Sequence, residues 1–292
     1  MKKCLIVQNG FYSSPSSENR YLRLKEELEK RGVATETVTT DKVVAYLTGK
    51  GDIALTCFSM PDFVLFLDKD NYVAQMLEGL GLRLFNSAES IRLCDDKMLT
   101  HIALANKGVA MPRTIASTLF YAGEDKGVFL SEIEKYLDYP IVVKGCFGSL
   151  GKEVELCSSR EELFEARKRW LKLPHIYQEY ISSSKGKDIR VILVGGKAVA
   201  SFMRENKSDF RSNVEMGGKG KPFTPPQSYI QTAERVAEIL GLDYCACDLL
   251  IGRDGEPILT EVNSNAFFAE GERVTGVDVA GAYAEYIVRN ID

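Results

Sequence analysis

The sequence predicts a protein of mixed α/β and α+β class that is divided into three lobes. Its 292 residues exceed the usual size of one domain, which is about 100 to 150 residues. In residues 1–95, short apolar strands alternate with helical stretches, and this pattern is typical of a parallel α/β lobe. Residues 96–180 and 181–292 instead carry hairpins joined by glycine turns, which predicts two largely antiparallel α+β lobes.

The first lobe opens with a strand and a helix. Residues 3–8 are apolar and end at Asn9-Gly10, and an amphipathic helix is expected at 18–31, where Gly32 stops it. The alternation continues with strands at 33–39, 53–58, 63–67 and 83–85 and with helices at 41–47 and 71–80.

Capping residues and glycine turns delimit the elements of the other two lobes. Two capping boxes predict helices: Ser131 with Glu134 before 133–137, and Ser159 with Glu162 before 163–171. The remaining elements are a helix at 97–107, strands at 140–145, 153–157, 189–194 and 198–204, a helix at 227–240, a hairpin at 245–263 and a closing helix at 278–289.

The composition excludes several classes of protein. With 45% apolar residues and a formal net charge of -4, the chain is neither a disordered protein nor a general nucleic-acid binder. Its longest apolar runs are of strand length, and the Met1-Lys2-Lys3 start leads into a strand, so we expect a cytoplasmic protein without membrane contact. Seven cysteines without regular spacing predict reduced thiols, with Cys146 in a glycine-rich loop the more accessible one. The two histidines are isolated from other catalytic residue types, which disfavours triad hydrolysis and histidine-based metal chemistry.

The hairpin at 245–263 carries a candidate metal site. A two-residue turn at Asp254-Gly255 fixes a register that places Asp248 opposite Glu261, and the period of two brings Asn263 to the same face. Two carboxylates and an amide oxygen are ligands that suit Mg²⁺ or Mn²⁺ bound together with substrate phosphates. A hairpin with solvated polar residues is the alternative at this point.

Two lysines and a glycine-rich loop are candidate phosphate ligands. Lys144 ends a buried strand and is followed by the loop 145–152, whose glycines would let backbone N–H groups approach a phosphate closely. The spacing does not fit a Walker loop, and a plain tight hairpin stays open. Lys97 follows Asp95-Asp96 at a helix start, and residues 178–181 resemble a hinge whose backbone could meet a nucleobase edge.

Three arginines are candidates for stabilising a phosphoryl or acyl phosphate group: Arg190, Arg204 and Arg211. A strict two-residue turn at Gly195-Gly196 would pair Arg190 with Ser201 and would turn Arg204 to the opposite face. Both could then reach one ligand only through a β-bulge, so Arg211 is the preferred candidate over Arg204.

Taken together and in this order, the motifs resemble the ATP-grasp superfamily, and within it the RimK-like amino-acid ligases, over the whole chain. The resemblance implies an ATP-grasp fold in which two α+β lobes clasp ATP. It implies nucleotide contacts at Lys97, Lys144, Gly148, Ser149, Gly151, Gln178, Glu179, Tyr180, Asp188, Arg211, Ser212 and Asn213. It also implies two Mg²⁺ or Mn²⁺ ions held by Asp248, Glu261 and Asn263, with Glu261 bridging them.

The resemblance further implies a carboxylate-amine ligase that forms an amide through an acyl phosphate and releases ADP and phosphate. Arg190, Arg204, Arg211 and Asn213 would act on the reacting group. The amine would be an amino acid such as glutamate, and the carboxylate acceptor a small molecule, a peptide or a protein. Modification of a peptide, formation of a dipeptide, and a regulator that binds ATP without turnover are the alternatives.

One segment departs from the better-known members of the family. Where RimK has a short turn after the metal-binding asparagine, this chain has the longer segment 264–272, which includes Phe267 and Phe268. The two phenylalanines shape an acceptor pocket or anchor the loop in the core. The sequence does not choose between these, nor does it reveal the general base or whether identical chains assemble.

Overall fold

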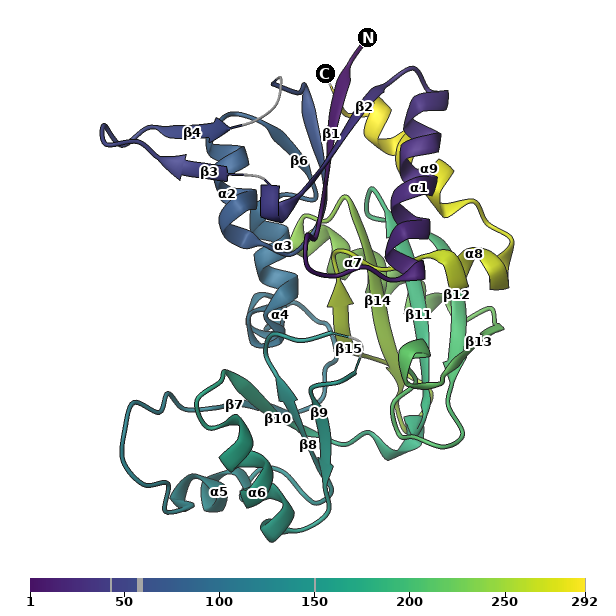
Figure 1. Ribbon diagram of the computed structural model, residues 1–292. Coiled ribbons are helices and arrows are strands. Elements are labelled where there is room, and N and C mark those ends of the chain that lie inside the picture. Colours follow the sequence, from purple (N-terminus) through teal and green to yellow (C-terminus); the bar gives the residue numbers. More distant parts are fainter. Residues whose placement is uncertain (43, 57–59, 150, 292) are drawn as a thin grey trace.

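The computed structural model describes residues 1–42, 44–56, 60–149 and 151–291 (Figure 1). Three larger sheets form its framework, with strand orders β2-β1-β5-β6, β7-β10-β8-β9 and β13-β12-β11-β14-β15, and a fourth sheet is the two-stranded β3-β4. The first sheet is parallel, whereas all pairs in the second and third are antiparallel. The predicted change from parallel to antiparallel pairing along the chain is therefore confirmed.

The parallel sheet occupies the amino-terminal part of the chain. Its strands are β1 (Lys3–Gln8), β2 (Ala34–Thr39), β5 (Phe63–Leu67) and β6 (Arg83–Phe85), and its helices are α1 (Pro15–Lys30) and α2 (Asn71–Gly79). Helix α1 begins earlier than predicted because Ser14 caps it, its hydroxyl accepting the Ser17 N–H. Every residue of β5 is buried, as expected for a central parallel strand.

The predicted helix at 41–47 is wrong. A short 3₁₀ turn, η1 (Thr40–Lys42), precedes β3 (Val44–Leu47), which pairs antiparallel with β4 (Ile53–Thr56). The tight turn between them closes with a hydrogen bond from the Gly51 N–H to the Thr48 carbonyl, and this local hairpin outcompetes a helix. The strand predicted at 53–58 therefore lies outside the parallel sheet, and positions 57 and 58 fall outside the described residues.

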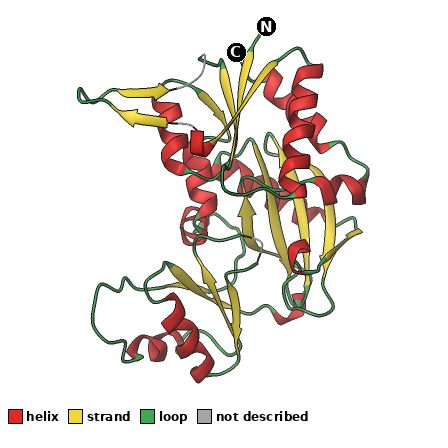
Figure 2. Cartoon of the chain, in the orientation of Figure 1, coloured by secondary structure: helices red, strands yellow, loops and turns green. Residues whose placement is uncertain are grey.

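The second sheet has two helices on one side, as Figure 2 shows. Its strands are β7 (Thr114–Ala116), β8 (Ile141–Gly145), β9 (Val154–Cys157) and β10 (His175–Glu179), and the helices are α5 (Val128–Ile133) and α6 (Arg160–Trp170). Ser159 caps α6 by accepting the Glu162 N–H, as predicted. The capping box at Ser131 is wrong, because α5 starts after Gly127, whose φ is 69° and whose N–H is held by Asp125.

The third sheet carries the predicted hairpins. Its strands are β11 (Lys187–Val194), β12 (Lys197–Glu205), β13 (Lys219–Pro222), β14 (Tyr244–Ile251) and β15 (Pro257–Asn263). Two 3₁₀ turns, η2 (Ser182–Ser184) and η3 (Val214–Met216), lie in the connections. The associated helices are α3 (Ala88–Asp95), α4 (Lys97–Leu104), α7 (Gln227–Leu240), α8 (Ala269–Thr275) and α9 (Val279–Arg289). Helix α7 matches its prediction, whereas α8 was not predicted.

The first and third sheets share one apolar core. Buried side chains of β1, β5, β11 and β12 pack in a single cluster with Phe268 and with α9, which lies beside α1 in Figure 1. The second sheet has a separate core with α5 and α6. The carboxyl-terminal helix therefore joins the amino-terminal part to the third sheet.

The described cysteines are all reduced and buried, including Cys146. Six cysteines are described, and all are buried and free of disulfides. Cys146 is only 4% exposed, so its expected accessibility is wrong: its N–H and carbonyl are tied to Pro174 and Lys97, which hold it inward. No helix in the described part of the chain is long and apolar enough to cross a membrane.

Candidate active site

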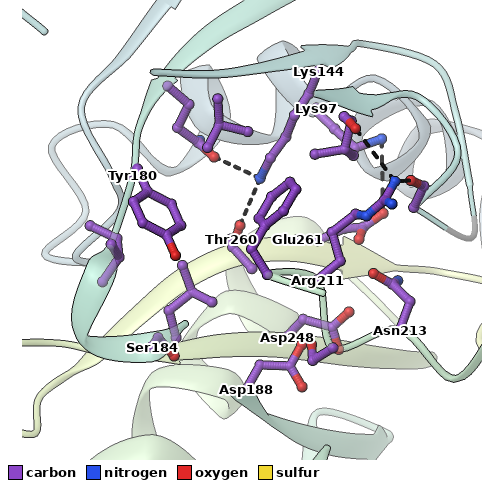
Figure 3. Close-up of a pocket in the computed structure, with 18 of the residues that line it drawn as sticks. Lys97, Lys144, Tyr180, Ser184, Asp188, Arg211, Asn213, Asp248, Thr260 and Glu261 are labelled. Carbon is purple, nitrogen blue, oxygen red and sulfur yellow. Dashed lines mark hydrogen bonds and ion pairs between the residues drawn. The ribbon is translucent and has the colours of Figure 1, made fainter. Parts of the chain in front are cut away.

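A cavity lies between the second and third sheets, and its walls gather the residues predicted to contact a nucleotide (Figure 3). The lining includes Lys97, Lys144, Gly148, Ser149, Gly151, Gln178, Glu179, Tyr180, Asp188, Arg211, Ser212 and Asn213. Arg204, Asp248 and Glu261 also line it. We call it the first cavity.

Lys144 projects from β8 into the first cavity. Its ammonium donates to Gln178 Oε1 at 2.7 Å and to Thr260 Oγ1 at 3.0 Å, both neutral acceptors. Burial lowers the pKa of Lys144 to about 8, although the charges of Glu261 and Asp248 act in the other direction. Among the described residues, no carboxylate forms an ion pair with Lys144, so its charge stays available to a ligand.

Lys97 begins α4, where Asp96 caps the helix by accepting the Met98 and Leu99 N–H groups. Its Nζ donates to the Gly148 carbonyl at 3.1 Å and lies 3.8 Å from Glu261 Oε1. The glycine-rich loop therefore lies against Lys97 and lines the same cavity as Lys144, as expected for a phosphate cradle.

The Gln178 side chain belongs to a buried chain of hydrogen bonds. His101 Nδ1 lies 2.8 Å from the Lys97 carbonyl and must donate to it, so Nε2 accepts from Gln178 Nε2 at 3.0 Å. Gln178 Oε1 is then free to accept from Lys144. His101 looks isolated in the sequence, because its partner Gln178 lies 77 positions away on another element. Burial lowers the pKa of His101, which favours this neutral state.

One end of the first cavity is apolar. Val142, Tyr180, Ile181, Phe210 and Leu250 line it, and the rings of Tyr180 and Phe210 meet edge to face with centroids 6.2 Å apart. An apolar slot next to the 178–181 backbone can receive a flat heterocycle, with the lysines at the opposite end for phosphates.

A bulge in β12, with Val199 as the extra residue, decides where the arginines point. Gly195 and Gly196 form the predicted two-residue turn, with φ values of 56° and 74°, but the register shifts between Ile192 and Leu193. Arg190 therefore pairs with Phe202, and the pairing with Ser201 expected from a strict turn is wrong. The shift also pairs Asp188 with Arg204, so both arginines lie on one face.

Both arginines bind Asp248. Arg190 donates from Nε and Nη2 at 2.7 and 2.8 Å, and Arg204 Nη2 lies 2.9 Å from Asp248 Oδ2 while also pairing with Asp188. Burial acts to raise the pKa of Asp248, but the two guanidinium groups hold it below its ordinary value. Arg204 is thus part of the same cluster as Arg190, against the preference for Arg211.

Arg211 secures the glycine-rich loop. Its Nη1 donates to the Gly151 carbonyl at 2.6 Å, and its Nε and Nη2 bind Asp209 at 3.0 and 2.7 Å. A Cβ at Gly151 would lie 2.9 Å from Asn213 Oδ1, so the loop and the 209–213 segment meet closely over the cavity.

The candidate metal ligands lie on adjacent strands. Asp248 pairs with Glu261 as predicted, although the turn is longer than predicted: the Gly252 N–H bonds to the Glu256 carbonyl, and a bulge after Asp248 restores the register. Asn263 Nδ2 lies 3.4 Å from Asp248 Oδ2.

These residues fit a divalent cation. The Glu261 side chain is 23% exposed, and its recorded ion pair, with Lys97, is 3.8 Å long, so its oxygens face the cavity. Both carboxylate oxygens of Asp248 accept hydrogen bonds from Arg190. Among the described residues, no group of three or more His, Cys, Asp or Glu is arranged to hold a metal ion. Glu261 and the Asn263 oxygen would therefore hold Mg²⁺ together with phosphate oxygens, and the third ligand, Asp248, stays a prediction.

A second cavity of about 440 Å³ adjoins the first. Ser149, Glu153, Arg204, Asn213 and Glu261 line both, while the predicted residues Arg190 and Asn263 line the second alone. Its other walls come from the start of α1, the ends of β1 and β5, and the segment after β15. The two cavities thus meet at Arg204, which is expected to act on the reacting group, and at Glu261, which is expected to hold the metal.

The two phenylalanines after β15 have different environments. Phe267 lines the second cavity, whereas Phe268 is fully buried in the shared core. The interpretation as a core anchor is therefore confirmed for Phe268, whereas an acceptor pocket at Phe267 stays a prediction. Thr260 and Glu153 also line the cavities and were not predicted; only the bulged register, which the sequence does not reveal, turns Thr260 toward Lys144.

The fold and site have counterparts among known proteins. A model of the RimK-like ATP-grasp domain matches residues 94–287. Human N-acetylaspartylglutamate synthase A is 34% identical over 280 residues, covering 90% of this chain and 70% of that protein. Danio rerio beta-citrylglutamate synthase B is 34% identical over 223 residues, covering 76% of this chain but only about half, 54%, of that protein.

A solved structure shows the same architecture. The RimK domain ATP-grasp protein from Sphaerobacter thermophilus superposes with a TM-score of 0.73 at 19% identity, covering 98% of this chain and 99% of that chain. The predicted resemblance and fold class are confirmed. The chain has the ATP-grasp fold, belongs to the RimK-like ATP-grasp family and is an ATP-grasp ligase.

Proposed function

We propose that this ligase uses ATP to activate a carboxylate and joins it to the amino group of an amino acid such as glutamate. The observation that carries the proposal is the junction of two cavities at Arg204 and Glu261, one suited to a nucleotide and one to a small molecule. Both curated relatives described above are named for products that contain glutamate, which supports glutamate as the amine.

In this proposal ATP occupies the first cavity. The apolar slot near Tyr180 receives adenine, Asp188 lies near the ribose, and Lys97 and Lys144 bind phosphate oxygens. Lys144 suits this role because its two hydrogen-bond partners are uncharged and leave its positive charge available. A bound Mg²⁺ at Glu261 and Asn263 would neutralise further phosphate charge.

The reaction would run where the cavities meet. A carboxylate oxygen of the acceptor attacks the γ-phosphorus of ATP, and the bond from that phosphorus to the bridging oxygen breaks to release ADP. The amine nitrogen then attacks the acyl carbon, phosphate leaves with the bonding electrons, and the nitrogen loses a proton. Arg190 and Arg204 are fixed by Asp248 and supply donors for the charge that develops on the acyl group.

The glycine-rich loop would protect the acyl phosphate from water. Lys97, Arg211 and the close contact of Gly151 with Asn213 hold the loop across the cavity. Exclusion of water favours transfer to the amine over hydrolysis.

The proposal is tested by ADP release with Mg²⁺ and ATP, with each of the twenty amino acids supplied alone and together with N-acetylaspartate, citrate or glutarate. Release that requires glutamate and one of the acids is the expected result, and Glu261→Gln should abolish it, because the variant loses a carboxylate from the metal set. Full turnover by that variant would refute the metal assignment. ATP binding without amino-acid-dependent ADP release would favour the regulator instead.

A further inference from the structure

Arg20 is a buried cation in the wall of the second cavity. It lies in α1, is 5% exposed and lines the second cavity, as Arg190 and Arg204 do. Among the described residues, no acidic side chain forms an ion pair with it. This contrasts with Arg190 and Arg204, which both bind Asp248. A buried cation without a counter-ion is costly, and such groups are normally paired.

The groups that accept hydrogen bonds from Arg20 are neutral, and some of its N–H donors remain without an acceptor in the described part of the chain. Its Nη1 donates to the backbone and side-chain oxygens of Asn265, and its Nη2 donates to the Leu67 carbonyl at 3.2 Å. A guanidinium has five N–H donors, and Nε, although buried, has no partner among the described residues. The Phe267 ring lies against the guanidinium, 5.0 Å from its carbon to the ring centroid.

Two acidic groups in the wall of the second cavity, Asp68 and Glu270, are engaged elsewhere. Asp68 accepts the N–H groups of Lys69 and Asp70 and the Thr40 hydroxyl. Glu270, on the same cavity, binds Arg273. Burial lowers the pKa of Arg20 to about 10, although Asp68 and three nearby tyrosines act in the other direction, so the site holds a cation that an anionic ligand would stabilise.

The backbone around Arg20 also favours an anion. Ser16 and Ser17, in the first turn of the 16-residue helix α1, line the same cavity, and this end of a helix carries partial positive charge. The cavity lies at the carboxyl ends of β1 and β5, between which the strand order reverses: β2 lies beside β1 on one side and β6 beside β5 on the other. Ligands of open parallel sheets bind at such a switch point.

We propose that the second cavity binds an acceptor with two carboxylates and that Arg20 receives the one that is not activated. The inference rests on the proposed function, because it takes the carboxylate near Arg190 and Arg204 as the one that is phosphorylated. It deepens that function by assigning the acceptor to the small dicarboxylates and by making Arg20 a specificity-determining residue.

The test compares matched acids that differ only in the second carboxylate. The pairs are N-acetyl-L-aspartate against N-acetyl-L-asparagine and glutarate against its monoamide, and calorimetry measures their dissociation constants with Mg²⁺ and a non-hydrolysable ATP analogue present. We expect the wild type to prefer the diacid about 10- to 100-fold, the range for a hydrogen-bonded charge. Arg20→Gln should reduce that preference to near unity, and Arg20→Lys should restore part of it.

Arg23→Gln is the matched control, since Arg23 lies on the same helix but pairs with Asp278 at 2.7 Å and Glu272 at 3.6 Å. It should leave the preference unchanged. If Arg20 only anchors Asn265, its loss would weaken diacid and monoamide alike and keep their ratio, which would overturn the inference. The inference would also be overturned if none of the acids bound to the wild type. The same holds if the wild type discriminated only between glutamate and glutamine as the amine. In each of these cases amino-acid-dependent ADP release would still support the ligase proposal, so the two can fail separately.

Discussion

Lys144 illustrates how one side chain acquires its properties from neighbours that are distant in sequence. Its position at the end of a buried strand is visible in the sequence, but its acceptors Gln178 and Thr260 belong to two other strands. Gln178 is in turn oriented by His101, which has no local motif. Residue identities therefore predicted the charged groups of the site, whereas the network that orients them depends on tertiary packing.

We expect the affinity for ATP to depend on the protonation of Lys144. Burial lowers its pKa to about 8, so the ammonium is present below that pH and is lost as the pH rises through it. Phosphate binding requires the charged form, and the dissociation constant of a non-hydrolysable ATP analogue should therefore increase above about pH 8. Calorimetric titrations between about pH 6.5 and 9.5 measure this.

Lys144→Arg provides the control for that titration, because a guanidinium stays charged across the range. Its profile should lose the inflection near pH 8 whatever its absolute affinity. An unchanged inflection in the variant would assign it to another group, and a flat wild-type profile would contradict the role of Lys144.

At the scale of elements, two bulges determine the geometry of the site. The shift between Ile192 and Leu193 in β11 brings Arg190 and Arg204 to one face, and the shift after Asp248 in β14 restores its pairing with Glu261. The turns that precede them, at Gly195-Gly196 and Asp254-Gly255, are evident from the sequence. Bulges are not, because the extra residue is selected by packing on both faces of the sheet.

The same distinction explains which elements were predicted. Helix α7 and strand β5 have strong periodicity or continuous burial, and their bounds follow from the sequence. The 41–47 segment was misassigned because a hairpin and a short helix share its apolar spacing, and α8 was missed because it lacks a side-chain cap. Local sequence patterns thus predicted the elements whose capping or burial is unambiguous.

We predict that Gly151→Ala will weaken ATP binding more than it lowers stability. Gly151 has a φ of 73°, and an added Cβ would lie 2.9 Å from Asn213 Oδ1, so the loop or the Asn213 side chain must shift at the wall of the cavity. The backbone strain should lower the free energy of unfolding by about 1 to 2 kcal/mol. Chemical denaturation and titration with the ATP analogue measure the two effects.

Gly255→Ala is the control for Gly151→Ala. Gly255 has a φ of 84° in the β14–β15 turn, but an added Cβ there meets no atom within 4 Å. It should show a similar loss of stability with unchanged affinity. Equal losses of affinity in both variants would mean that the loop contact with Asn213 does not matter for binding.

At the scale of the whole molecule, the chain is organised around two kinds of core. The first and third sheets share a core through Phe268 and α9, whereas the second sheet has a separate core with α5 and α6. The nucleotide cavity lies between the second and third sheets, and the second cavity lies between the joined sheets and the glycine-rich loop of the second sheet. The sequence predicts three consecutive lobes, but it does not reveal that the last helix, α9, packs against the first, α1.

This organisation predicts that a defect in the shared core will propagate across two sheets. Phe268→Ala removes a fully buried ring and should lower the free energy of unfolding by about 3 to 5 kcal/mol. Hydrogen exchange measured by mass spectrometry should then accelerate in β1 and β5 as well as in β11 and β12, because these strands pack in one cluster with Phe268. Leu163→Ala, in the core of the second sheet, should accelerate exchange in β8 to β10 and leave β1 and β5 protected. If Phe268→Ala left the parallel sheet unaffected, the first and third sheets would unfold independently, and the shared core would not couple them.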